Sequence, residues 1–174
     1  HLIKKNLIVK GEYPILWCVN DQNAVGEDDI QGADTEKVEV QEFVGLKFAL
    51  EGTKEFLVAG TFRPETIYGA TNIWLNPTAM YNRVNVDGEV WIVSKEATKK
   101  LKQQNHEIKV LDELPGSEWI GKNVFAPRVP DRLLPILPAT FVLPDHATGV
   151  VYSVPAHAPY DYIALRDLQE DSST

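Results

Sequence analysis

One stretch of this chain places polar side chains where they could act on a ligand. It is Thr61-Phe62-Arg63-Pro64-Glu65-Thr66, which joins two apolar, strand-like runs. Pro64 fixes its own φ and moves the preceding residue out of the helical region, so the chain must turn here. Glu65 suits the first turn of a short helix, which Gly69 can close in a left-handed conformation. Polar groups displayed between buried strands commonly form sites, although a well-capped connection between strands would have a similar sequence.

A second stretch, Pro155-Ala156-His157-Ala158-Pro159-Tyr160-Asp161, begins a helix that we predict over residues 159–169. Pro159 suits the first helical position, which puts Asp161 in the first turn. Apolar residues follow Asp161 at offsets of three, four and seven, so the acid lies on the apolar face of the helix. An inward carboxylate needs backbone amides, an arginine or a cationic ligand as its partner. Asp161 is therefore either a helix-capping acid or a receptor for an ammonium group.

Other kinds of site find little support in the sequence. Residues 116–123 have the spacing of a phosphate-binding loop, but Asn123 stands where a magnesium-binding Ser or Thr is required. We expect Trp119, inside that stretch, to pack into the core. The four histidines show no paired ligand spacing, and one cysteine cannot form a zinc cluster. No Gly-x-Ser-x-Gly elbow is present, and Cys18 lies in an apolar run, which predicts a buried, unreactive thiol.

Size and charge set outer limits on function. The chain has 174 residues and a net charge of −8, which predicts a single domain over 1–174, cut from a longer polypeptide, and disfavours a general nucleic-acid binder. A partner held locally is still compatible with that charge. The single cysteine favours a reducing compartment, and no apolar run reaches the length of a membrane span.

The pattern along the chain predicts many short strands and two or three helices. We expect an acidic loop over 20–37, a strand region over 38–50 that Gly45 interrupts, and a hairpin that turns at Asp87-Gly88. The prolines between 127 and 144 predict short edge or bulged strands. Further strands are expected over 13–19, 55–59, 73–75, 107–111 and 148–155, and a helix capped by Ser94 over 94–104. The fold class is mainly β with a few helices (α+β), curled and barrel-like.

Together the two stretches resemble the editing domains of leucyl-tRNA synthetases, above all those of the archaeal and eukaryotic branch. The resemblance rests on residues 61–66 with 71–77 (Thr-Asn-Ile-Trp-Leu-Asn-Pro) and on 148–168, and it extends over essentially the whole chain. The first motif alone is not specific, because valyl-tRNA synthetase editing domains have a similar one. The resemblance implies the barrel-like fold of the valyl, isoleucyl and leucyl editing domains.

The resemblance implies hydrolysis of mischarged tRNA, a step that fidelity requires. One methylene is worth only ~1–3 kcal/mol in an apolar pocket, a limit for which aminoacyl-tRNA synthetases are the usual example. Carried over by motif, Asp161 would bind the α-amino group of the attached amino acid, and Thr61 would position the terminal ribose and the ester. Thr66 would obstruct leucine, Arg63 would orient the substrate, and an ordered water would attack. The implied substrate contacts are Arg63, Thr66, Phe62, Tyr152, Ser153, Val154 and His157, with Tyr152 and Val154 lining the side-chain pocket.

The resemblance implies no metal and no cofactor for editing, since ATP and Mg belong to the synthetic core, whose His-x-Gly-His and Lys-Met-Ser-Lys-Ser signatures are absent here. Its implied partners are the tRNA 3′ end with a noncognate amino acid and the rest of the synthetase chain, with no membrane and a cytoplasmic location. The alternatives are a valyl-type editing domain and a non-catalytic module that docks the tRNA 3′ end. Ala147 and Ala158 depart from the family, which often has Gly and, in bacteria, an acid there.

Overall fold

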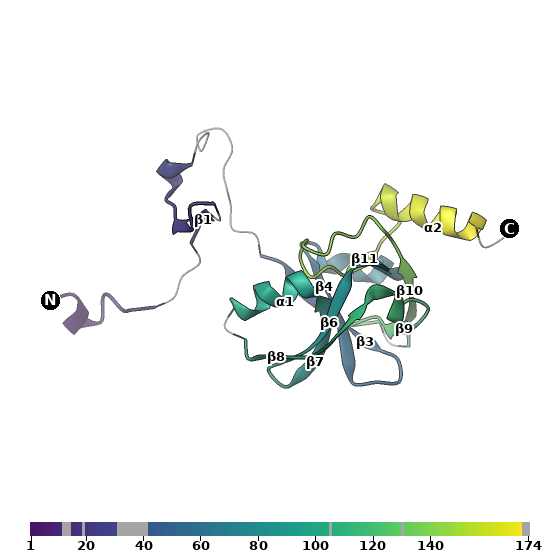
Figure 1. Ribbon diagram of the computed structural model, residues 1–174, viewed down its shortest axis with the longest axis horizontal. Coiled ribbons are helices and arrows are strands. Elements are labelled where there is room, and N and C mark those ends of the chain that lie inside the picture. Colours follow the sequence, from purple (N-terminus) through teal and green to yellow (C-terminus); the bar gives the residue numbers. More distant parts are fainter. Residues whose placement is uncertain (12–14, 19, 31–41, 105, 130, 172–174) are drawn as a thin grey trace. The chain divides into compact units, whose positions relative to one another are not determined.

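The computed structural model describes residues 1–11, 15–18, 20–30, 42–104, 106–129 and 131–171, in two compact units, His1–Glu42 and Phe43–Thr174 (Figure 1). The first unit holds short elements: η1 (Ile3–Lys5), β1 (Trp17–Cys18), β2 (Asn23–Ala24) and η2 (Glu27–Asp29). β1 and β2 pair as an antiparallel ribbon, so part of the expected acidic loop is ordered structure. Cys18 is half-buried, not buried as predicted, and its Sγ lies 3.2 Å from Asp21 Oδ2. The expected strand residues 13, 14 and 19 lie outside the described part.

The second unit is built on one nine-stranded mixed sheet in the order β11-β5-β10-β9-β3-β4-β7-β6-β8. Within the described residues its end strands, β11 and β8, each have one neighbour, so the sheet is open and not a hydrogen-bonded barrel. The predicted mainly β fold with few helices is confirmed. Its elements are β3 (Val44–Leu50), β4 (Glu55–Thr61), η3 (Pro64–Gly69), β5 (Asn72–Leu75), β6 (Met80–Val86), β7 (Glu89–Ser94), α1 (Lys95–Lys102), β8 (Ile108–Pro115), η4 (Gly116–Glu118), β9 (Asn123–Phe125), β10 (Leu133–Pro138), β11 (Val151–Ser153) and α2 (Pro159–Asp171).

Local turn and capping signals in the sequence predicted several of these elements. Asp87 and Gly88 both have positive φ (50° and 96°) and connect β6 to β7, as the Asp-Gly signal indicated. Ser94 caps α1 by accepting a hydrogen bond from the Ala97 amide at 3.0 Å. Gly45 does not interrupt β3 as expected, because it pairs directly with Gly60 of β4. Residues 38–41 of that expected strand lie outside the described part.

The proline-rich strand β10 lies inside the sheet, whereas we expected an edge. Its first half, Leu133 to Pro135, pairs with β9, and its second half, Ile136 to Pro138, pairs with β5. Each half therefore has one neighbouring strand, and Ile136 also donates to Lys122 O and accepts from the Gly121 amide, just before β9. Pro135 and Pro138 lack an amide proton, and such residues are tolerated where only one side of a strand is paired.

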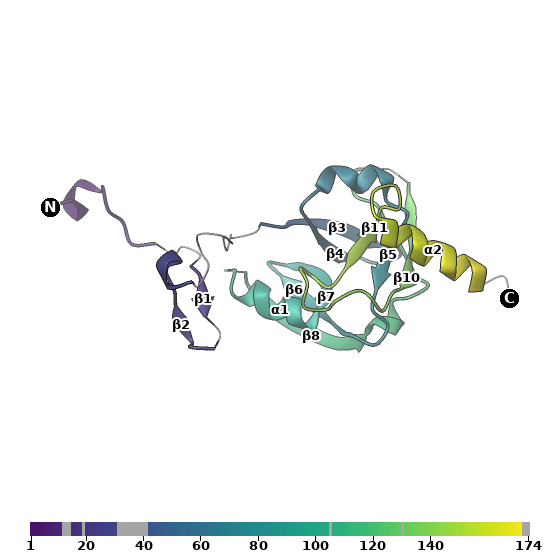
Figure 2. The same cartoon turned by 90° about the horizontal axis from the view of Figure 1, so that it is seen from above.

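The main core is formed by side chains of β3, β4, β5, β6, β7, β9, β10 and β11, with Ile67 of η3 and Trp119. Trp119 is 3% exposed and belongs to this core, which confirms its structural role. Helix α2 lies beside β11, β5 and β10 (Figure 2), and its Leu165 and Leu168 pack against Trp74 and Val142. This packing fixes the start of α2, where Asp161 is found, against the strand that carries Trp74.

The loop before β11 is attached to the sheet by buried hydrogen bonds. The hydroxyl of Tyr81 donates to Gly149 O at 2.8 Å, and burial raises the pKa of Tyr81 to about 12. Thr148 Oγ1 accepts from the Gly60 amide at 3.1 Å. Ala147 has a φ of +47°, a left-handed conformation that favours glycine and accounts for the glycine of the family motif. The alanine nevertheless leaves the loop joined to β4.

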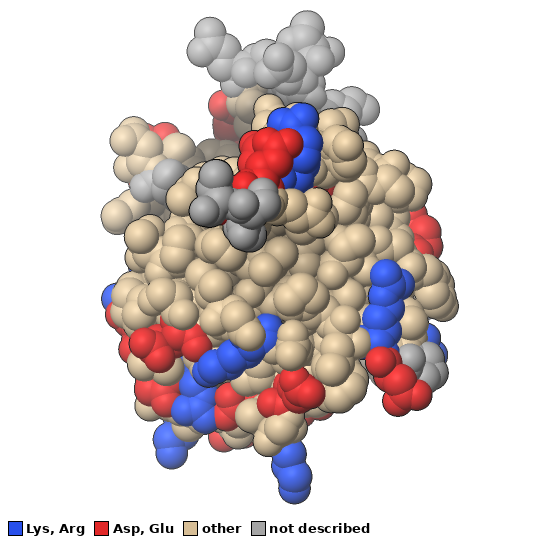
Figure 3. Space-filling model, turned by 90° about the vertical axis from the view of Figure 1, so that its right-hand side faces the viewer, with Lys and Arg blue, Asp and Glu red and all other residues tan. Residues whose placement is uncertain are grey.

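The described helices include none long and apolar enough to cross a membrane. On the face shown in Figure 3, charged residues of both signs gather mainly along the lower edge, and uncharged surface occupies the centre. A polyanion that approached this face would meet separate basic side chains and no continuous basic patch.

Candidate functional site

The phenolic oxygen of Tyr152 contacts both threonines of the bend, which consists of residues Thr61 to Thr66. It lies 2.7 Å from Thr66 Oγ1, 3.1 Å from Thr61 Oγ1 and 3.0 Å from the carbonyl oxygen of Arg63. β4 ends at Thr61, η3 contains Thr66, and Tyr152 is the middle residue of β11. The role of Tyr152 as a wall of the side-chain pocket stays a prediction, and its hydroxyl contacts Thr61, Thr66 and the carbonyl oxygen of Arg63.

Each hydroxyl of Tyr152, Thr61 and Thr66 has one proton, which limits the hydrogen bonds that it can donate. Thr66 Oγ1 donates to the carbonyl oxygen of Arg63 at 2.8 Å, so it can accept from Tyr152. Thr61 Oγ1 accepts from the Arg63 amide at 3.0 Å. Because a phenol has one proton, Tyr152 can donate to only one of these oxygens at a time. The Thr66 hydroxyl is thus oriented by its own bond to the Arg63 carbonyl, and the Thr61 oxygen by the Arg63 amide, and positioned side chains are what such a site requires.

We expect Tyr152→Phe to loosen this arrangement without emptying the core. The ring, whose centroid lies 5.8 Å from that of Phe48, would stay in place, and only the hydroxyl would be lost. Loss of a buried hydrogen-bonded hydroxyl should lower the free energy of unfolding by about 1–2 kcal/mol. Any activity that depends on the orientation of Thr61 and Thr66 should fall about tenfold, since small displacements of positioning groups are costly. Urea unfolding and the rate of ester hydrolysis measure the two effects.

Tyr81→Phe is the matched control for this prediction. It also removes a buried hydroxyl with two partners, Gly149 O and the Asn76 amide, but neither is part of the bend. The control should lose comparable stability and keep its rate. Equal loss of rate in both variants would mean that the Tyr152 hydroxyl acts through overall stability alone.

Asp161 is buried, as the sequence predicted, with 6% of its surface exposed. Its Oδ1 accepts a hydrogen bond from Trp74 Nε1 at 3.0 Å, and its Oδ2 accepts from the Val154 amide at 2.7 Å. The carboxylate is thus held by one donor on each oxygen. Each oxygen keeps further acceptor capacity, because a carboxylate has about four lone-pair positions. Both donors lie outside α2, so these two hydrogen bonds of the carboxylate are with the strand β5 and with the segment before the helix, and the receptor interpretation stays a prediction.

The two predicted stretches meet at one short segment, Tyr152 to Val154. At one end of this segment the Tyr152 hydroxyl contacts Thr61 and Thr66, and at the other end the Val154 amide binds Asp161. β11 pairs with β5 in a register that places Val151 opposite Trp74, the second partner of Asp161. The sheet therefore connects parts of the chain that lie far apart in sequence.

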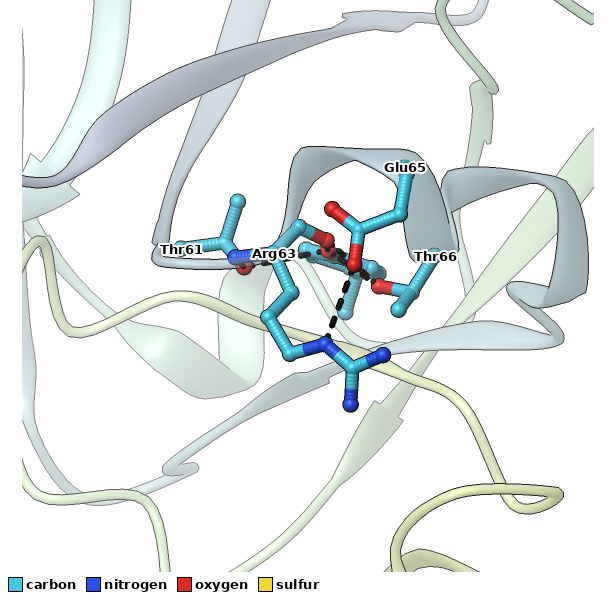
Figure 4. Close-up of polar contacts among 5 residues, drawn as sticks. Thr61, Arg63, Glu65 and Thr66 are labelled. Carbon is cyan, nitrogen blue, oxygen red and sulfur yellow. Dashed lines mark hydrogen bonds and ion pairs between the residues drawn. The ribbon is translucent and has the colours of Figure 1, made fainter.

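Arg63 and Glu65 form an exposed ion pair at the bend (Figure 4), with Arg63 Nε 3.0 Å from Glu65 Oε1. The pKa of the Glu65 carboxyl lies below its usual value, mainly because of a hydrogen bond from its own backbone amide and then because of Arg63. A smaller electrostatic contribution from His157 lowers the pKa of Glu65 in the same direction. Two terminal nitrogens of Arg63 extend away from Glu65 (Figure 4).

Three predicted substrate contacts, Val154, Ser153 and Phe62, differ in how far they are buried. Val154 is buried, and its Cγ1 lies 3.2 Å from where a β-carbon on Gly69 would stand. A side chain at position 69 would therefore press on Val154, and Gly69 is not left-handed as we predicted, since its φ is not positive. Ser153 is buried, and its Oγ has no hydrogen-bond partner among the described residues, while Phe62 is 53% exposed.

One residue that holds the site was missed by the sequence reasoning. Trp74 is fully buried, and its indole N–H orients Asp161. The residue stands in the Thr-Asn-Ile-Trp-Leu-Asn-Pro segment, which was recognised only as a motif. A tryptophan in a four-residue apolar strand gives no sign that its N–H needs an acceptor, so only the tertiary structure identifies this role.

Comparison with known proteins agrees with the motifs. A family model described as the leucyl-tRNA synthetase editing domain matches residues 40–167. The chain is 47% identical over 172 residues to a leucine–tRNA ligase of Methanopyrus kandleri, covering 99% of this chain and 18% of that protein. It is 48% identical over 174 residues to one of Staphylothermus marinus, covering 98% of this chain and 18% of that protein. The chain thus spans less than a fifth of the length of these relatives.

Solved structures give the same result for the fold. A structure described as GlLeuRS-CP1 has a TM-score of 0.69 and 31% identity, covering 75% of this chain and 61% of that one. The editing domain of the P. knowlesi cytosolic leucyl-tRNA synthetase has a TM-score of 0.68, with 76% of this chain and 63% of that chain covered. At 21% identity the second likeness concerns the fold alone.

Proposed function

Because the chain belongs to the family of leucyl-tRNA synthetase editing domains, we propose that it hydrolyses the ester between a noncognate amino acid and the 3′ end of leucine tRNA. The reaction adds water across the ester and releases the free amino acid and the tRNA hydroxyl. Isoleucine, methionine and norvaline are the proposed amino acids. The partners in this proposal are the tRNA 3′ end and the rest of a synthetase chain, in the cytoplasm.

Asp161 is the proposed receptor for the α-ammonium group. Its two internal donors, Trp74 Nε1 and the Val154 amide, fix the orientation of the carboxylate and leave lone pairs for an ionic hydrogen bond. Its low exposure strengthens such a contact, because a buried charge interacts more strongly than one in water. A substrate cation would also give this buried carboxylate the countercharge that buried ions usually have.

Thr61 is the proposed positioning group for the terminal ribose and the ester, and Arg63 assists with substrate orientation. The chain's own contribution to hydrolysis is then to bind and orient, so that an ordered water reaches the carbonyl carbon. A 2′- or 3′-hydroxyl of the substrate can help to hold that water. Among the described residues no group of three or more His, Cys, Asp or Glu side chains could hold a metal ion.

Thr66, Tyr152 and Val154 are the proposed walls of the amino-acid pocket. The hydroxyl of Thr66 is engaged with Tyr152 and with the Arg63 carbonyl, which leaves its γ-methyl as the group that can face a ligand. Ser153 and His157 are kept as proposed contacts of the substrate. An aliphatic wall of this kind separates amino acids by shape.

The observation that most supports the proposal is the segment from Tyr152 to Val154, which links the threonine bend to a buried carboxylate. The test is release of amino acid from charged tRNA by the full 174-residue chain. We expect isoleucine to be released from leucine tRNA faster than leucine is.

The same assay separates the two rivals. Faster release of threonine from valine tRNA would select a valyl-type editing domain. Binding of the tRNA 3′ end with no release from any charged tRNA would select a non-catalytic docking module. The single domain over 1–174 stays a prediction, since the structure describes two compact units individually.

A further inference from the structure

Three aromatic rings from separate segments meet beside Thr61. Phe43 precedes β3, Phe62 follows β4, and His146 belongs to the loop before β11. The rings of Phe43 and Phe62 are stacked, with centroids 4.0 Å apart and an angle of 28° between their planes. His146 meets Phe43 edge-on, at a centroid distance of 5.8 Å and an angle of 88°.

The strand register explains why Phe43 and Phe62 stack. The last pair of the β3–β4 ladder is Val44 with Thr61, so the two phenylalanines occupy the next positions on each strand. A cross-strand aromatic pair of this kind contributes to sheet stability. If the aromatic pair served only to stabilise the sheet, we would expect both rings to be covered by other side chains. Here Phe43 is half-buried, whereas Phe62 is 53% exposed and therefore presents apolar surface to solvent.

Further exposed aromatic side chains are adjacent in sequence to the two halves of the candidate site. Tyr68, in η3, is 66% exposed, and Tyr160, the neighbour of Asp161, is 79% exposed. Arg132 Nη1 donates to the carbonyl oxygen of Tyr68 at 2.9 Å, and the side chain of Arg63 is 64% exposed. Aromatic rings with nearby guanidinium groups are the combination that proteins use to bind single-stranded nucleic acid.

We propose that the exposed face of Phe62, supported from behind by Phe43, stacks on a nucleobase of the substrate's single-stranded 3′ end. This inference rests on the proposed function, because Thr61, the residue before Phe62, is the group that would position the terminal ribose. The net charge of −8 limits what attraction to phosphates can contribute. Stacking does not depend on charge, and every nucleobase has a π-face. The Phe62 ring would therefore bind a base without distinguishing one nucleotide sequence from another.

The test uses hydrolysis-resistant probes and the full chain. One probe is a trinucleotide that carries isoleucine through an amide at its 3′ end, and the second is the same molecule with the bases removed from all three riboses. Phe62→Leu keeps an apolar side chain on Phe43 but lacks a π-face, and Phe62→Trp keeps the π-face. Binding is measured by calorimetry, and urea unfolding reports whether each variant keeps its stability.

Phe62→Leu should weaken binding of the base-containing probe about 5- to 150-fold, since stacking on one ring is worth ~1–3 kcal/mol per base. Binding of the abasic probe should change less than twofold, and Phe62→Trp should bind both probes like the unaltered chain. Phe125→Leu is the control, because Phe125 is also exposed (39%) but pairs with Ala49, about 20 Å along β3 from Phe43. It should change neither binding constant.

Equal weakening of both probes by Phe62→Leu would show that Phe62 only stabilises the end of the β3–β4 pair, and the inference would be overturned. If Phe62→Leu binds both probes like the unaltered chain and still hydrolyses mischarged tRNA, the stacking proposal would be overturned and the proposed function would stay intact. A chain that neither binds the base-containing probe nor hydrolyses any charged tRNA would remove both proposals together.

Discussion

Replacing Asp161 by alanine is expected to reduce deacylation and stability at the same time. The carboxylate accepts two buried hydrogen bonds, from Trp74 Nε1 and from the Val154 amide. Each donor left without a partner costs about 1–3 kcal/mol, so the free energy of unfolding should fall by about 2–6 kcal/mol. Loss of the contact with the substrate ammonium, worth about 1.5–3 kcal/mol, should lower kcat/KM by a further ~10- to 150-fold.

Asp161→Asn separates the two effects, because the amide has the shape of the carboxylate and keeps one acceptor oxygen. Its stability loss should be about half that of the alanine variant, while the charge that binds the ammonium is fully removed. The control is Asp167→Asn on the same helix, whose exposed carboxylate pairs with Arg166 at 2.9 Å. We expect the control to change neither the rate nor the stability.

A substrate change provides the decisive measurement for Asp161. An ester of the corresponding α-hydroxy acid lacks the ammonium group, so it should be hydrolysed more slowly than the amino ester by the unaltered chain. Asp161→Asn should show little difference between the two esters, because the interaction that distinguishes them is gone. The contrary outcome is that the rate loss from removing the substrate ammonium and the rate loss from Asp161→Asn combine as independent effects. In that outcome the carboxylate does not contact the ammonium group and serves only to hold α2 and β5 together.

The inward orientation of Asp161 could be predicted because it follows from local spacing. Proline at the first helical position and apolar residues at fixed offsets determine which face of a helix is buried, and 6% exposure confirms the result. The η3 turn after Pro64 was equally local, as was the Asp87-Gly88 hairpin. In each case the residues that fix the structure lie within a few positions of one another.

The partners of these residues could not be predicted, because they are set by strand register. Tyr152 lies 91 residues from Thr61 and 86 from Thr66, and Trp74 lies 87 from Asp161. Whether such pairs meet depends on the pairing of β5 with β11, and a shift of one residue would turn each side chain to the opposite face. The same reason applies to the error at Gly69, where the close neighbour of this small residue is Val154, 85 positions along the chain, and the backbone is not left-handed.

The internal hydrogen bonds of the site have a consequence for specificity. Tyr152 and the Arg63 carbonyl engage the hydroxyl of Thr66, so this oxygen is constrained before any substrate arrives. A constrained hydroxyl fixes the γ-methyl on the same carbon, and a rigid methyl group can exclude a side chain by shape. Discrimination against leucine would then depend on one methyl group and on the hydroxyl that orients it.

Thr66→Ala should therefore make correctly charged leucine tRNA a substrate. Removal of an obstructing group of about one methylene in size is worth ~1–3 kcal/mol, so leucine release should rise about 10- to 200-fold while isoleucine release changes little. Thr66→Ser, which loses only the methyl, should behave like the alanine variant. Thr66→Val, which keeps the methyl and loses the hydroxyl, should still exclude leucine, with weaker exclusion if the side chain rotates.

The three variants also separate exclusion by shape from an effect of the hydroxyl. If Thr66→Val releases leucine and Thr66→Ser does not, the hydroxyl and its contact with Tyr152 exclude leucine, and the methyl group does not. Tyr152→Phe is then the control, since it would release leucine as Thr66→Val does. If all three variants at position 66 still reject leucine, Thr66 does not control access to the pocket. Release of leucine and isoleucine from leucine tRNA, measured in parallel for each variant, distinguishes these outcomes.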